Sequence, residues 1–201
     1  LTSLPPVPRM YTGDWPYSRG KSRAELERFI SCTAQYGDNL DLSRTPCNIF
    51  TYKVLETFYG VSSDEFYRNS VPLLANELAD HVASSPYWKA LGTIRQQENI
   101  DEATRLAIEG HAVIGVYKNP HGHGHVFTVL PALATFVDSR PEYKNAWGEL
   151  RQPQVANFAL DGCIKPGEIK RCYVDGPVSQ GVRFRSPALV DSIVLFVRKF
   201  P

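Results

Sequence analysis

Apolar residues recur at steps of three and four through the first half of the chain, and in alternation or short runs through much of the second half. Steps of three and four are typical of amphipathic helices, whereas alternation is typical of strands. The predicted helices cover 24–30, 46–59, 71–82 and 100–109, with a short helix or turn at 87–91. The predicted strands cover 111–117, 125–130, 154–159 and 193–197, with weaker candidates at 171–174 and 182–184. Helices followed by an antiparallel sheet predict an α+β fold.

The helix that begins near Thr45 carries signals for both its start and its stop. Thr45 is a good N-cap, and Pro46 suits the first helical position because its missing N–H costs nothing there. Gly60 supplies a left-handed stop. Cys47 therefore lies in the first turn, where unpaired N–H groups favour an anion and a thiol ionises more easily. A buried structural cysteine is the competing interpretation.

The strands at 111–117 and 125–130 flank a turn that is dense in glycine and histidine, at residues 118–124. This arrangement predicts a β-hairpin. A catalytic thiolate needs an imidazole to hold its proton and a third polar group to orient that ring. We prefer His125 as the base because it opens a strand and is held rigidly, whereas His123 lies in the turn.

Several alternatives stay open at this point. His111 or His123 can replace His125 as the base. Asn157, in a strand-like segment, is the preferred orienting group, and Asp138 beside a predicted loop is the alternative. The alternating histidines of the turn also fit a metal-binding tract, although the sequence has no HExxH motif and no paired CxxC motif.

Composition narrows the classes of protein that the chain can belong to. Its 201 residues suffice for a full core, and we expect an extended arm at 1–20 followed by a single domain at 21–201 with a helical insert at 61–109. The net charge of +1 gives no support to nucleic-acid binding. The sequence contains no apolar run of about 18 residues, so it predicts no membrane-spanning helix. Of the four cysteines, Cys163 and Cys172 bracket a turn-like loop, so they either form a local bridge or stay reduced.

Three short motifs together resemble a known family: Cys47–Phe50 at a helix start, Gly110–Gly115, and Gly124–Val129. They look like the papain-like fold in its bacterial NlpC-type peptidase and amidase form, over roughly residues 35–160. One departure is that the usual Asp-Cys-Ser-Gly around the nucleophile is here Pro46–Ile49. With this departure, the chain looks more like the divergent amidases that are delivered as antibacterial effectors than like housekeeping cell-wall enzymes.

The resemblance implies a fold, an activity and site residues. The nucleophile helix would pack on a small antiparallel sheet, with Cys47 as nucleophile, His125 as base and Asn157 as the orienting residue. Tyr36 and Asn48 would serve the oxyanion or substrate site. The expected activity is hydrolysis of an amide in a bacterial peptidoglycan peptide, with no cofactor.

The resemblance also implies where such an enzyme acts. We expect a protein that is secreted or delivered to the periplasm or cell wall, with an immunity or inhibitor protein as an expected partner. Two other functions remain: a papain-fold deamidase or acyltransferase acting on another acyl substrate, and a non-catalytic module that binds a metal or partner through the histidine-rich turn.

Overall fold

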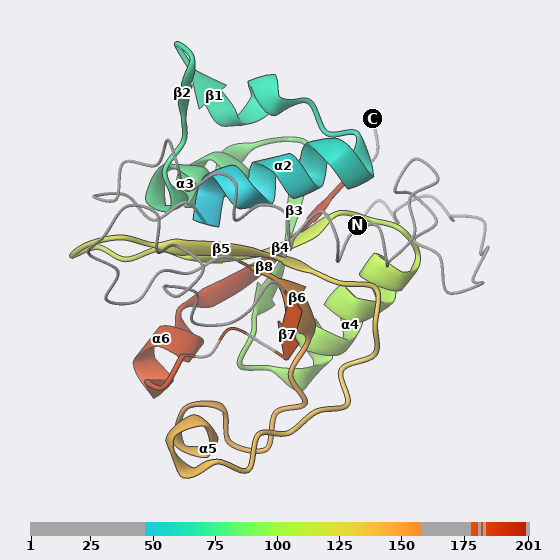
Figure 1. Ribbon diagram of the computed structural model, residues 1–201, viewed down its shortest axis with the longest axis vertical. Helices are drawn as coiled ribbons and strands as arrows, with labels where there is room; N and C mark the ends of the chain where they lie inside the picture. Colours follow the sequence, from blue (N-terminus) through green and yellow to red (C-terminus); the bar gives the residue numbers. More distant parts are fainter. Residues whose placement is uncertain (1–46, 158–177, 181, 183, 200–201) are drawn as a thin grey trace, which may run out of the picture.

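The computed structural model describes residues 47–157, 178–180, 182 and 184–199 (Figure 1). Its centre is a six-stranded antiparallel sheet in the order β3-β8-β4-β5-β6-β7. The strands are β3 (Trp88–Thr93), β4 (Val113–Tyr117), β5 (His125–Val129), β6 (Gln154–Ala156), β7 (Val178–Gln180) and β8 (Ile193–Arg198). The α+β class is therefore confirmed.

Helices cover both faces of this sheet. The helices are α2 (Cys47–Tyr59), the 3₁₀ helix η2 (Ser63–Phe66), α3 (Ala75–Ser84), α4 (Gln97–Ile108), α5 (Pro141–Trp147) and α6 (Pro187–Asp191). Figure 1 shows α2 and α3 on one side of the sheet and α4, α5 and α6 on the other. A small two-stranded sheet, β1 (Tyr67–Arg68) and β2 (Val71–Pro72), lies between η2 and α3 in the chain. Among the described residues, no helix is both long and apolar enough to cross a membrane.

The sheet separates two hydrophobic cores, and β5 shows how. Val126 packs with the α2 and α3 side chains, whereas Phe127 and Val129 pack with α4 and α5. Successive strand residues point to opposite faces, so one apolar strand supplies both cores. We refer to these two sides as the α2 face and the α4 face.

Several predicted elements are present. The helix that starts at Cys47 is α2, and Gly60 follows it with a left-handed φ of 67°. The hairpin is formed by β4 and β5, with Tyr117 paired to His125. The predicted strands near 154 and 193 are β6 and β8.

Other predictions were wrong. The segment 87–91 was predicted as a short helix or turn; Tyr87 lies in a turn, but residues 88–91 belong to β3, which pairs with β8 at the edge of the main sheet. The span 61–109 is therefore not a purely helical insert. The helix predicted at 71–82 starts only at Ala75, because Val71 and Pro72 form β2. The short helices α5 and α6 were not predicted, because each is too short to show a helical period.

Some expectations fall outside the described residues. These are the arm at 1–20, the helix at 24–30, the strand candidate at 171–174, the oxyanion candidate Tyr36 and the pair Cys163 and Cys172.

Candidate active site

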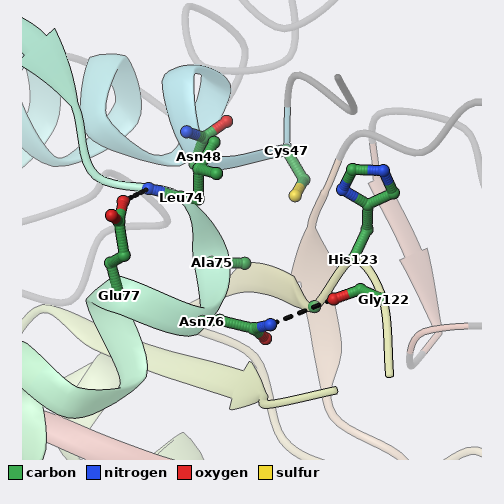
Figure 2. Close-up of a pocket in the computed structure, with 9 residues that line it drawn as sticks. Cys47, Asn48, Leu74, Ala75, Asn76, Glu77, Gly122 and His123 are labelled. Atoms are coloured by element: carbon green, nitrogen blue, oxygen red, sulfur yellow. Dashed lines mark hydrogen bonds between the residues drawn. The ribbon is translucent and has the colours of Figure 1, made fainter. Parts of the chain in front are cut away.

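The first residue of α2 and the first turn of α3 meet at one pocket. The pocket has a volume of about 120 Å³ and is lined by Cys47, Asn48, residues 74–77 and residues 122–124. Figure 2 shows Cys47 and the start of α3 on one side and His123 on the other. Only 1% of Cys47 is exposed, so its thiol belongs to the pocket wall and not to the outer surface. The first turn of a helix carries its positive dipole end, so the start of α3 favours an anion in this pocket.

Buried hydrogen bonds fix the start of α2. Asn48 Nδ2 donates to the Leu73 carbonyl oxygen at 2.8 Å, and the Tyr52 hydroxyl donates to the same oxygen at 2.6 Å. Burial, followed by the nearby Cys47 thiol, raises the pKa of Tyr52, so its phenol stays protonated and can donate. Thr51 Oγ1 lies 3.5 Å from the Val126 carbonyl oxygen, which joins the helix to β5.

The contact between Thr51 and Val126 locates Cys47 along β5. One turn of helix, from Thr51 back to Cys47, spans about 6 Å. Two residues of a strand span about 6.6 Å, so the same step back from Val126 reaches Gly124. Gly124 indeed lines the pocket together with Cys47. The thiol therefore lies beside the backbone that leads directly into His125.

The pocket brings Cys47 together with His123. The His123 side chain is exposed and extends from the turn that joins β4 to β5. Figure 2 shows its ring and the Cys47 sulfur at the same pocket. The His123 ring and the Cys47 thiol therefore border the same pocket.

His125 forms a second pair, with Asn157. Its Nε2 lies 2.8 Å from Asn157 Oδ1 in a buried hydrogen bond, which is the contact expected from the sequence. The amide oxygen can only accept, so Nε2–H donates in this hydrogen bond. The His125 ring lies 6.3 Å from the Phe127 ring and 5.8 Å from the Phe184 ring, measured between ring centres. Phe127 and Phe184 pack in the α4 core.

The structure therefore places Cys47 and His125, which the sequence analysis paired, on different faces of the sheet. The imidazole of His125 lies on the α4 face, whereas the Cys47 thiol packs on the α2 face. The two pairs, Cys47 with His123 and His125 with Asn157, adjoin at Gly124 and the first residue of β5. Sequence spacing could not show this, because it does not tell which face the first residue of a strand points to.

His111 does not belong to this site. It lies six residues before Tyr117, the partner of His125, which corresponds to about 20 Å along the strand direction. It is only 1% exposed, and burial lowers the pKa of its imidazole. The expectation that His111 could serve as the base is therefore not supported.

Two other candidates have structural roles. Both carboxylate oxygens of Asp138 accept from the guanidinium of Arg140, and its Oδ1 also accepts from the Arg140 backbone N–H at 3.1 Å, so Asp138 serves its own loop. Asn48 lines the pocket, but its amide donates to Leu73, which ties α2 to the start of α3. Within the ranges that the structure describes, no three His, Cys, Asp or Glu side chains form a group that could hold a metal, so the turn does not assemble its imidazoles as a metal site.

Sequence reasoning missed the contribution of α3 to the site. Leu74, Asn76 and Glu77 border the pocket, and Glu77 Oε2 accepts from the Leu74 N–H at 2.7 Å as a helix cap. Glu77 follows the N-cap residue Leu74 by three positions, as in a capping box, but Leu74 has no side-chain oxygen, so this signal is incomplete in the sequence. Comparisons with protein-family models and with curated proteins find no match for this chain.

Proposed function

We propose that this chain is a cysteine peptidase or amidase with a papain-like arrangement of its site. The observation that carries the proposal is the position of Cys47, on the buried helix α2 and in the wall of a pocket bordered by a histidine-bearing turn. A thiol there has His123 at the same pocket and His125 directly after Gly124 as candidate bases for its proton.

The proposed base is His125. It is buried, it opens a strand, and Asn157 orients its ring through Nε2. His123 has access to the thiol, but its side chain is exposed on a turn. An oriented imidazole is the more effective base, because orientation removes an entropic cost from the proton transfer. The His125 ring lies on the α4 face and the thiol on the α2 face. Catalysis by His125 therefore requires a movement at the first residue of β5 that brings the ring to the thiol.

The proposed reaction has two steps. The base takes the thiol proton, and the sulfur then attacks the amide carbonyl carbon, forming a C–S bond. As the C–N bond breaks, the protonated imidazole gives its proton to the leaving amine. Water, deprotonated by the same imidazole, then attacks the acyl carbon and releases the thiolate.

The negative oxygen that forms during each attack needs donors. The Cys47 backbone N–H is the first proposed donor, because it belongs to the residue that carries the nucleophile. The first turn of α3 brings further backbone N–H groups to the same pocket, between Ala75 and Glu77. Each such donor is worth roughly 10²–10³ in rate.

The proposed substrate is a bacterial peptidoglycan peptide, cleaved in the periplasm or cell wall by a secreted or delivered enzyme. This substrate rests on the family resemblance of the motifs around Cys47 and His125. An immunity or inhibitor protein that covers the pocket is the proposed partner. A deamidase or acyltransferase acting on another acyl group would use the same thiol chemistry.

The test is incubation of the full chain with purified muropeptides, followed by mass spectrometry. We expect new products whose masses show gain of one water across an amide bond. The Cys47→Ala variant should lower this rate by about 10⁴-fold or more, because it removes the nucleophile. Full turnover by Cys47→Ala would refute the proposal, whereas unchanged muropeptides with an active thiol would exclude this substrate.

A further inference from the structure

One side chain joins α3 to the turn that carries the histidines. Asn76, in the first turn of α3, donates from Nδ2 to the Asn119 carbonyl oxygen at 2.8 Å and to the Gly122 carbonyl oxygen at 3.0 Å. Its Oδ1 accepts from the Asn119 N–H at 2.9 Å. Figure 2 shows the amide of Asn76 directed at Gly122, with His123 immediately beyond it. A single amide therefore forms three hydrogen bonds with the backbone of the turn.

Gly124 allows this close approach. A Cβ atom added there would lie 2.4 Å from the Tyr117 carbonyl oxygen and 2.6 Å from Asn76 Oδ1, and 3.2 Å from the Ala75 Cβ. Distances under 3 Å essentially never occur between real Cβ atoms and their neighbours, so any other residue would shift either the hairpin backbone at Tyr117 or the Asn76 amide. The Asn76 hydrogen bonds thus fix the turn to α3, and the absence of a side chain at Gly124 leaves room for this contact.

We propose that Asn76 is a positioning residue: it fixes the turn at 118–124 to the start of α3 and so sets where the imidazoles lie relative to Cys47. This inference rests on the proposed function, since it concerns the same site. Asn76 lines the pocket but its amide is used on the turn, so it acts through His123 and through the start of β5. A displacement of the order of 1 Å at a reacting group costs about 10²-fold in rate.

The experiment compares two substitutions at Asn76 with a matched control. Asn76→Ala removes all three hydrogen bonds. Asn76→Asp keeps the volume of the side chain and the acceptor for the Asn119 N–H but loses both donors. The control is Asn99→Ala, because Asn99 also lies in the first turn of a helix and donates to a backbone carbonyl, that of Thr93 at 2.8 Å, on α4 and away from the pocket.

Three quantities are measured on the full chain: the midpoint of thermal unfolding, kcat and KM on muropeptides, and the pH profile of Cys47 alkylation by iodoacetamide. Alkylation is quantified on the Cys47 peptide by mass spectrometry, so that the other cysteines do not contribute. We expect both Asn76 variants to lower kcat by about 10-fold to 100-fold with little change in KM. We also expect the alkylation profile to move to higher pH, because a displaced imidazole no longer favours the thiolate.

The control separates positioning from stability. Asn99→Ala should lower the unfolding midpoint without changing kcat or the alkylation profile. If the Asn76 variants behave like Asn99→Ala in all three measurements, Asn76 is only structural and the inference is overturned. If the wild-type chain cleaves no muropeptide but the alkylation profile still moves in Asn76→Asp and not in Asn99→Ala, the inference stands and the proposed substrate fails. Should Asn76→Ala not fold, Asn76→Asp alone decides.

Discussion

The helices α2 and α4 cover opposite faces of the same sheet and have similar lengths, of 13 and 12 residues, but they differ in how they are buried. On α4 the buried residues form one stripe, and the opposite side carries Arg105 in ion pairs with Glu102 and Glu109. On α2 the buried residues extend around the helix and include polar ones. The buried residues of α2 are Cys47, Asn48, Phe50, Thr51, Tyr52, Val54, Leu55 and Phe58.

This difference explains why a cysteine at the tip of α2 has chemical consequences. A thiol at the end of a surface helix such as α4 would be in water, where the helix dipole is screened. At the start of α2 the thiol is 1% exposed but borders a pocket, so the charges around it are less screened by solvent. Polar residues of α2 form buried hydrogen bonds to Leu73 and Val126, which hold that tip in place.

Apart from the loss of activity in Cys47→Ala, the largest effect that we expect is on kcat/KM when the imidazole of one face or the other is removed. His125→Ala should lower kcat/KM on muropeptides by about 10³-fold or more, because it removes the proposed base. His123→Ala should lower it by about 10-fold or less. Steady-state kinetics of the two variants, measured side by side, give the ratio.

The reverse order of these two losses would assign the base to His123. The reaction would then use only groups of the α2 face, and the hydrogen bond between His125 and Asn157 would have a purely structural role. Thermal unfolding of both variants is the control, because His125 is buried and its loss can also destabilise the fold.

The second effect tests the burial of α2 directly. Leu55 is 0% exposed in the core of the α2 face, so Leu55→Ala should lower the free energy of unfolding by about 2–5 kcal/mol. Arg105→Ala on the exposed side of α4 should cost less than about 1 kcal/mol, because exposed ion pairs contribute little. Urea unfolding followed by circular dichroism measures both. Equal costs would mean that α2 is no more deeply integrated than the surface of α4.

The smallest effect is a pH dependence of stability at the end of α4. Burial lowers the pKa of His111 below its usual value of 6.5, so the unfolded state binds the proton more readily than the folded state. Stability should therefore fall as the pH drops below about 6.5, by at most about 1.4 kcal/mol per pH unit for this one proton. In His111→Gln the difference in unfolding free energy between neutral and acidic pH should become smaller. An unchanged difference would show that other groups cause the acid sensitivity.

Much of the local structure could be predicted from the sequence. The helix from Cys47 to Gly60 and the hairpin around the glycine- and histidine-rich turn were predicted because their signals are local: a cap, a glycine stop and alternating apolar residues. The hydrogen bond between His125 and Asn157 was also expected, because Asn157 lies in a strand-like segment downstream of His125 and its amide oxygen can accept the ring N–H. By contrast, β3 was missed because its residues become a strand only through pairing with β8, more than a hundred residues later in the chain.

The sequence by itself determined that a cysteine starts a helix, that a histidine opens a strand, and that the chain folds as α+β. Only the tertiary structure decided that the thiol borders a pocket with α3 and His123, while His125 points to the other face with Asn157. The reason is physical: caps and periodicity act between residues close in sequence, whereas the meeting of two helix N-termini and the face of a strand's first residue depend on packing across the sheet.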